Sequence, residues 1–349
     1  MSVDTRVSNS KRNMIYGVFC QVVTILFTFI NRQTFIILLG KEYLGFNGLF
    51  SNILSLLSLA EMGLGNAFLF FLYKPIRDQD YIRLQSLLNF CKKIFYCVSL
   101  GIFIIGVLII PMFPYIIDLD MDFGKIILYY IIYLLNSVLS YFAVSKSMII
   151  EAYQKNYIIK VYKAIAVIFQ NIVQIIILLH FRSYMLYLLI QIGCTVLYNM
   201  SIAYKAYKMY PFIFKQNSKK LGQDDKKYIW GMVQSTFIYK IGTIIMNNTD
   251  NILISVIITT VAVGYYSNYK MVESVINYFI GVIVSAITAS LGDLNAENNK
   301  ARSLKTFRML VLLFHAATAF CSICFLLCIN DFIYIWIGEA YLLGVDVVI

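Results

Sequence analysis

Charged residues are scarce in this 349-residue chain, and the scarcity excludes an ordinary water-soluble domain. Only 13% of the residues are charged, whereas 60% are hydrophobic and the mean hydropathy is +0.76. A soluble protein carries about twice that share of charge, because water must wet its surface. There are only four prolines, and the apolar runs are long, which favours helical membrane spans over the short alternating strands of an outer-membrane barrel. The composition predicts an all-α polytopic membrane protein.

Nucleotide-binding and metal-binding motifs are also missing. No G-x-x-x-x-G-K-[ST] motif occurs, so nucleotide binding has no support. The only histidines are His180 and His315, and a lone histidine among apolar neighbours is typical of packing. Cys321, Cys324 and Cys328 have a metal-like spacing, but no further ligand is nearby, and buried cysteine behaves as a small hydrophobe.

Three aspartates in one connection resemble a calcium loop in their spacing. Asp118, Asp120 and Asp122 alternate as calcium ligands do, but Phe123 stands where the turn needs glycine and Tyr129 where a bidentate glutamate belongs. We therefore expect no metal and no cofactor. The remaining connections on that side are very short, so no catalytic domain is expected there, and the chain is predicted not to be an enzyme.

Nine apolar runs are long enough to cross about 30 Å of hydrocarbon, and a tenth begins near the end of the chain. The segment before the first run is polar and basic with no cleavage site, so we expect this run to be a retained anchor. The runs occupy residues 14–39, 46–73, 94–117, 126–145, 164–181, 183–204, 229–255, 262–290 and 309–330.

The basic residues are concentrated in alternate connections. The N-terminal segment and the even-numbered connections hold 23 of the 29 lysines and arginines, whereas the odd-numbered connections hold only Lys41, Lys125 and Arg182. The positive-inside rule then places the N-terminus in the cytoplasm. Membrane insertion thus explains the formal charge of +11, and we expect contact with anionic membrane lipids and no nucleic-acid partner.

A weak internal repeat appears when the sequence is compared with itself at an offset of 216 residues. The shift lays Gly48–Asn52 on Gly264–Asn268 and superimposes the first two runs on the seventh and eighth. A repeat of six spans is even, so both copies enter the membrane from the same side and run parallel. We predict a six-helix lobe over residues 1–217 and a second lobe over 218–349 that is incomplete.

Polar residues recur along one face of the first and seventh runs, and the repeat pairs the two stripes. Small and polar residues are also common packing contacts between membrane helices, which is the alternative interpretation of the serines, threonines and glycines. The stripe of the first run consists of Gln21, Thr24, Thr28 and Asn31, and that of the seventh of Thr236, Lys240, Thr243, Asn247 and Asn251.

Six charged residues lie inside the spans, where each would cost roughly 2.5 to 3.5 kcal/mol if it faced lipid at mid-depth. We therefore expect them to face one another or water. The alternatives are an ion pair between two of them that are one helical turn apart and an arginine that extends to the outer interface. The six are Arg32, Glu61, Lys240, Asp250, Lys270 and Glu273; the possible ion pair is Lys270 with Glu273, and the arginine is Arg32.

Cations and carboxylates gathered in one cavity suit the binding of an anionic headgroup. Arginine offers phosphate a bidentate fork, and lysine offers a point charge. The predicted substrate ligands are Arg32, Lys240, Lys270, Asn31 and Asn247. The predicted residues for a coupling proton or sodium ion are Glu61, Asp250 and Glu273.

Several motifs resemble those of the Wzx-like polysaccharide flippases of the multidrug/oligosaccharidyl-lipid/polysaccharide (MOP) exporter superfamily. The resemblance covers most of the chain, although each motif is loose. The motifs are the region of Arg32, Leu44–Ile53, Leu56–Gly65, Leu72–Ile76, Asn248–Ser255, Val263–Tyr269 and Ile335–Gly338.

This resemblance implies a MATE-like pair of six-helix lobes in the bacterial inner membrane. Such a protein would move polyprenyl-diphosphate-linked oligosaccharide repeats to the outer leaflet by alternating access, for O-antigen, capsule or a similar surface polymer. It would work beside a polysaccharide polymerase and glycosyltransferases. Family members are longer at the C-terminus, in agreement with an incomplete second lobe.

Three other functions remain open. The family is related to cation-coupled multidrug exporters, so drug export is one. An integral-membrane glycosyltransferase or polymerase is another, although such enzymes usually need a larger outside loop. A noncatalytic scaffold for polysaccharide enzymes is the third.

Overall fold

The computed structural model of the chain consists of helices joined by short turns, and the residues that it describes contain no strand. These are residues 3–57, 64–116, 122–215, 221–223, 225–227, 229–232, 234, 253–296 and 300–344. The elements are α1 Val3–Leu39, α2 Lys41–Leu57, α3 Leu64–Arg77, α4 Tyr81–Ile109, η2 Ile110–Met112, α5 Phe113–Ile116, α6 Phe123–Ser140, η3 Tyr141–Ala143, α7 Val144–Ala152, α8 Asn156–Phe181, α9 Tyr184–Met209, α10 Pro211–Phe214, α12 Thr260–Ala296, α13 Lys300–Ile337 and η4 Glu339–Tyr341.

Long helices with exposed apolar side chains are what a lipid environment requires. Leu108, Leu312 and Ile335 expose 69%, 71% and 81% of their surfaces, which would be costly in water but is neutral against acyl chains. Lipid offers no hydrogen-bond partners to the backbone, so spanning segments satisfy their own backbone groups as helices. The prediction of an all-α polytopic membrane protein is confirmed.

Six helical stretches in the described part of the chain are long and apolar enough to cross a membrane. They correspond to five of the first six predicted spans and to the span predicted at 309–330. The predicted span 46–73 corresponds to α2 and α3, which lie on either side of residues 58–63. The six stretches are Arg12–Leu39, Tyr81–Tyr115, Phe123–Ala152, Asn156–Phe181, Tyr184–Met209 and Thr306–Ile337.

Local sequence signals set the helix ends. Gly40, with a φ of +84°, ends α1 in a conformation that costs glycine little and lets α2 begin at the next residue. The Asp80 side chain accepts a hydrogen bond of 2.9 Å from the backbone N–H of Arg83 and caps α4. Pro211 occupies the first turn of α10, where its missing N–H is not needed.

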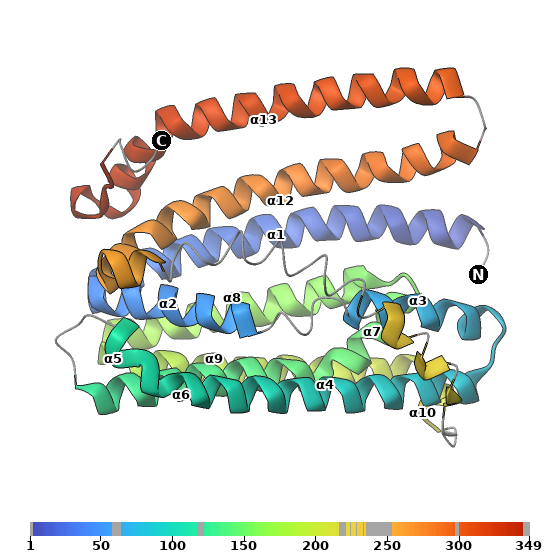
Figure 1. Cartoon of the computed structure of the whole chain (residues 1–349), viewed down its shortest axis with the longest axis horizontal. Helices are drawn as coiled ribbons and strands as arrows, with labels where there is room; N and C mark the ends of the chain where they lie inside the picture. The colour runs from blue at the N-terminus through green and yellow to red at the C-terminus, as the bar shows by residue number, and fades with distance from the viewer. Residues whose placement is uncertain are drawn as a thin grey trace. The chain divides into compact units, whose positions relative to one another are not determined.

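The chain divides into two compact units, Met1–Val261 and Ala262–Ile349. In the first unit α1 packs along α8, α8 along α9 and α9 along α6, as Figure 1 shows. Rings fill its core: the ring centre of Phe50 lies 5.7 Å from that of Phe46 and 5.3 Å from that of Tyr130. The lobe boundary predicted between residues 217 and 218 lies outside the described residues and stays a prediction.

A buried tyrosine organises the second unit, which contains most of α12 together with α13 and η4. The Tyr269 hydroxyl of α12 donates a hydrogen bond of 2.7 Å to Oδ1 of Asn330 on α13. The same oxygen accepts a hydrogen bond of 2.9 Å from the backbone N–H of Leu343. One phenol thereby joins both long helices to the segment after η4.

Replacing Tyr269 with phenylalanine should loosen this segment. The substitution Tyr269→Phe keeps the ring but leaves the Leu343 N–H and Asn330 Oδ1 without these partners, at a cost of about 1 to 2 kcal/mol. Hydrogen exchange of the Leu343 amide should become about tenfold faster. Tyr334→Phe on the exposed side of α13 is the control, and equal exchange in both variants would contradict the assignment.

Candidate functional site

Asn31 of α1 lies in a buried group of polar side chains from three helices. Its side chain is only 4% exposed, and its Nδ2 donates to Asn171 Oδ1 at 2.7 Å, to Gln174 Oε1 at 3.0 Å and to Tyr187 Oη at 3.2 Å. An amide nitrogen has only two hydrogens, so the three acceptors share them. We call Asn31, Asn171, Gln174 and Tyr187 the amide cluster.

The amide cluster joins α1 to α8 and α9. Asn171 and Gln174 lie one turn apart on α8, and Gln174 Nε2 donates a hydrogen bond of 3.1 Å to the Tyr187 carbonyl at the start of α9. Among the described residues, Asn31 Oδ1 and Asn171 Nδ2 are buried and have no hydrogen-bond partner. Such a neutral network costs less to bury than a charge, and it determines how the three helices align.

Arg32, the next residue, lies among phenols inside the first unit. The residue as a whole is partly exposed, and its charged group lies within electrostatic range of the hydroxyls of Tyr133 on α6 and of Tyr184 and Tyr187 on α9. The Arg32 side chain therefore points toward α6 and α9 and is not placed on the lipid-facing side of α1. We call Arg32, Tyr133, Tyr184, Tyr187 and Asn47 the Arg32 cluster.

Tyr133 brings further polar groups to the Arg32 cluster. Its hydroxyl donates a hydrogen bond of 3.0 Å to Asn47 Oδ1 on α2, and Ser51 and Gln191 lie next to the same hydroxyl. Four helices, α1, α2, α6 and α9, thus direct an arginine, phenols, amides and a hydroxyl toward one region. Every one of these groups can donate a hydrogen bond to an oxyanion or a sugar oxygen.

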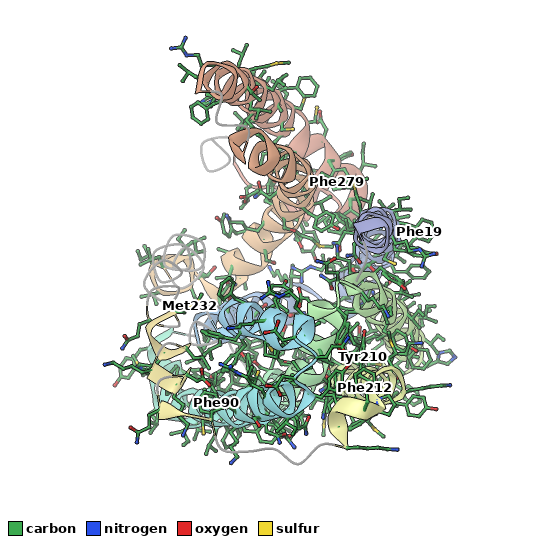
Figure 2. The ribbon with its side chains drawn as sticks, turned by 90° about the vertical axis from the view of Figure 1, so that its right-hand side faces the viewer. Phe19, Phe90, Tyr210, Phe212, Met232 and Phe279 are labelled. Atoms are coloured by element: carbon green, nitrogen blue, oxygen red, sulfur yellow. The ribbon has the colours of Figure 1, made fainter. Side chains whose placement is uncertain are left out.

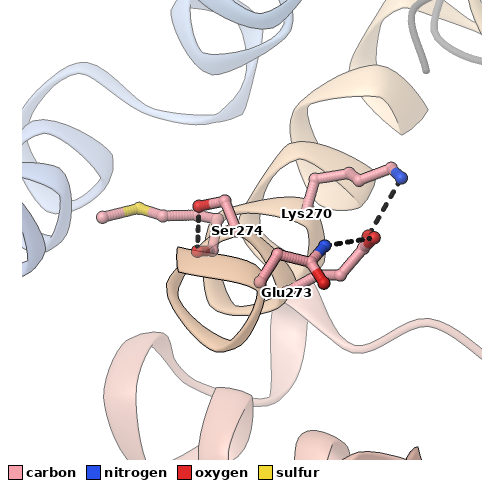
Figure 3. A network of polar contacts seen from close by, with 5 residues as sticks. Lys270, Glu273 and Ser274 are labelled. Carbon is pink, nitrogen blue, oxygen red and sulfur yellow. Dashed lines mark hydrogen bonds and ion pairs between the residues drawn. The ribbon is translucent and has the colours of Figure 1, made fainter. Parts of the chain in front are cut away.

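Lys270 and Glu273 of α12 form an ion pair in the second unit. Lys270 Nζ lies 2.9 Å from Glu273 Oε2, and Asn277 Nδ2 donates to Glu273 Oε1 at 3.2 Å, as Figure 3 shows. The two charged side chains are 31% and 42% exposed, so the pair is accessible. The ion pair between Lys270 and Glu273, which was one of the alternatives that the sequence left open, is therefore present in the structure. The predicted roles in substrate binding and coupling stay predictions.

Other predicted site residues fall outside the described part of the chain. These are Glu61, Lys240, Asn247 and Asp250. Within the described residues all seven cysteines are free, and no group of three or more histidine, cysteine or acidic residues could hold a metal ion.

Sequence reasoning missed several members of both clusters. Asn171 and Gln174 could have been found, since they are polar residues one turn apart in the middle of an apolar span. Tyr133 and Tyr187 had no such signal, because the chain has 27 tyrosines and most of them are ordinary packing residues in spacing and context.

Comparisons with known proteins bear on the fold. No protein-family profile and no curated protein matches the chain. A solved structure described as the inward-facing conformation of a multidrug resistance MATE family transporter of the MOP superfamily matches with a TM-score of 0.69 and 13% identity, covering 94% of this chain and 77% of that one. The chain has a MATE-like fold.

A second solved structure supports this MATE-like fold. It is described as a MOP superfamily transporter from Pyrococcus furiosus Vc1 (DSM3638) with a binding pocket of reversed polarity. The match has a TM-score of 0.55 and 13% identity, and it covers 97% of this chain and 75% of that one. At this identity the likeness concerns the fold. The MATE-like fold agrees with the multi-pass helical architecture expected from the sequence.

Proposed function

We propose that this chain is a flippase for an anionic, lipid-linked oligosaccharide. Its substrate class is polyprenyl-diphosphate-linked sugar, and its place is the bacterial inner membrane with a cytoplasmic N-terminus. The observation that carries the proposal is the Arg32 cluster, an arginine inside a membrane unit with phenols and amides around it. The MATE-like fold supports transport as the general activity.

The chemistry of the Arg32 cluster fits a diphosphate next to a sugar. A guanidinium binds two phosphate oxygens with parallel hydrogen bonds, while phenols and amides bind sugar hydroxyls. The cluster brings no nucleophile paired with a base, so it is suited to binding and release without bond cleavage. The prenyl tail needs no binding site on the protein, because it can stay in the lipid and only the charged headgroup is excluded from hydrocarbon.

The second unit contributes the remaining proposed ligands. Lys270 can exchange the Glu273 carboxylate for a phosphate oxygen, because both side chains of the pair are partly exposed. Lys240 and Asn247 are proposed as further ligands, and Glu61, Asp250 and Glu273 as carriers of the coupling ion. Alternating access would then carry the headgroup between leaflets, and a polysaccharide polymerase and glycosyltransferases are proposed as partners.

A reconstitution experiment tests the substrate class. The full chain is placed in proteoliposomes with a fluorescent polyprenyl-diphosphate oligosaccharide, and the fraction of the sugar that an external lectin can reach is followed over time. We expect this fraction to change faster than in protein-free liposomes. A rate equal to that of protein-free liposomes would refute the flippase.

Multidrug export is the second candidate, and the first structural match supports it because that protein is described as a multidrug resistance transporter. The same proteoliposomes loaded with a cationic dye distinguish the two. Dye accumulation driven by a proton or sodium gradient, without movement of the lipid-linked sugar, would favour drug export. We expect the opposite pattern, because an arginine at the Arg32 cluster repels cationic substrates.

A further inference from the structure

One end of the first unit combines lysines with aromatic rings. At this end, which we call the basic end, α4 begins and α7 and α9 terminate. Lys146 Nζ of α7 lies 4.2 Å from the ring centre of Tyr207 and 4.0 Å from that of Phe214. Lys92 Nζ of α4 lies 5.3 Å from the ring centre of Tyr96. These distances are those of cation–π contacts, which keep the ammonium groups near the rings.

Positive charge dominates the basic end. Two of its acidic residues are already paired, Asp225 with Arg83 at 2.9 Å and Asp78 with Arg77 at 3.3 Å. Figure 2 shows Tyr210 and Phe212 close together at this end, and Lys155 Nζ lies 5.7 Å from the Tyr210 ring centre. The described basic residues here are Arg12, Lys74, Arg77, Arg83, Lys92, Lys93, Lys146, Lys155, Lys160, Lys163, Lys205, Lys208, Lys215, Lys226 and Lys227, against the acids Asp78, Asp80, Glu151 and Asp225.

The rings near Lys92 and Lys146 form one strip across neighbouring helices. The ring centres of Tyr96 and Phe142 are 5.0 Å apart, and Phe142 lies four residues before Lys146 in a continuous helical stretch. Phe142 and Tyr207 are 47% and 48% exposed. We call Lys92, Tyr96, Phe142, Lys146 and Tyr207 the lysine–aromatic strip.

The lysines of this strip lie nearer the basic end than its aromatic rings Tyr96 and Phe142, which is the order found at a membrane interface. α4 runs from the basic end into the unit, so Tyr96 lies one turn deeper than Lys92. α7 runs toward the basic end, so Phe142 lies one turn deeper than Lys146. With the basic end at a membrane surface, this order would place the ammonium groups at the level of the lipid headgroups and the exposed rings at the level of the glycerol and upper acyl chains.

We propose that the lysine–aromatic strip binds an anionic phospholipid, with Lys92 and Lys146 holding its phosphate-bearing headgroup. The two ammonium groups complement the headgroup charge, and Phe142 and Tyr96 contact the chain below it. Zwitterionic lipids offer no net charge to this surface and bind more weakly. The inference concerns the outer face of the first unit and is independent of the proposed transport substrate.

Native mass spectrometry of the full chain in detergent tests the proposal. Phosphatidylglycerol and phosphatidylcholine with the same acyl chains are supplied at equal concentration. We expect phosphatidylglycerol to be retained preferentially. Lys146→Gln should lower its affinity about fivefold and the double variant Lys92→Gln/Lys146→Gln about 25-fold, because each basic residue near an anionic surface contributes roughly 1 kcal/mol.

Matched variants separate binding at the strip from general attraction. Lys125→Gln removes an exposed lysine at the opposite end of the unit, at the start of α6, and should leave retention unchanged. If Lys146→Gln does not fold, Lys92→Gln alone tests the strip, since that side chain is exposed. Equal retention of the two lipids by the unaltered chain, or an equal loss with Lys125→Gln, would overturn the proposal.

Discussion

Neutralising Arg32 should strongly reduce export of the lipid-linked sugar while leaving the chain inserted in the membrane. Arg32→Gln keeps a polar side chain but removes the charge and the guanidinium fork. Loss of a charge-assisted bidentate contact costs roughly 2 to 4 kcal/mol, which corresponds to a decrease in transport rate of about 30-fold to 1,000-fold. The rate is measured in proteoliposomes with the labelled polyprenyl-diphosphate oligosaccharide.

Two further variants make the Arg32 result interpretable. Arg32→Lys keeps the charge without the fork and should retain part of the activity. Thr34→Val changes a partly exposed residue on the same helix, whose hydroxyl donates a hydrogen bond to the carbonyl of Ile30, and it should transport normally. Full transport by Arg32→Gln, with normal protein levels, would remove the Arg32 cluster from the substrate path.

Replacing Asn31 with leucine should cause a large loss of stability. Asn31→Leu removes the donor shared by Asn171, Gln174 and Tyr187, so two buried amide oxygens lose a partner in a region that water does not reach. Hydrogen bonds between membrane helices are individually modest, but an unsatisfied buried acceptor adds its own penalty, so we expect about 2 to 4 kcal/mol of destabilisation. Denaturant unfolding in lipid nanodiscs measures it.

The double variant Asn31→Leu/Asn171→Leu gives a sharper result. If the amide cluster acts as a unit, removing donor and acceptor together should cost less than the sum of the two single substitutions. Strict additivity would show that the two side chains act independently. A loss below about 0.5 kcal/mol for Asn31→Leu, the range of ordinary surface substitutions, would show that the cluster contributes little to stability.

Helix positions were predictable because hydropathy acts over a whole segment. The predicted run 164–181 lies inside α8, and the run 183–204 lies inside α9 except for its first residue. The predicted run 94–117 lies inside the longer stretch Tyr81–Tyr115 except for its last two residues. The early start of α4 was missed, since its first turns carry Arg83 and other polar residues and extend the helix beyond the apolar part. The cap by Asp80 explains where α4 begins.

Side-chain partners were predictable only within one helix. The contact of Lys270 with Glu273 follows from a spacing of three residues, because such a pair shares one face of any helix. The polar stripe through Thr28 and Asn31 was visible for the same reason. Its partner stripe on α8 is about 140 residues away in the chain, and no spacing rule reaches that far.

Composition and the order of apolar runs are sufficient to establish a helical, multi-pass membrane protein, because backbone groups in hydrocarbon can be satisfied only within such helices. Which polar groups surround Asn31 and Arg32 was decided by the packing of α1 against α8 and α9 and by the position of Tyr133 on α6. That packing depends on the shapes of many apolar side chains at once. An arginine beside an asparagine in the sequence therefore acquires its phenol and amide neighbours only when the helices pack together.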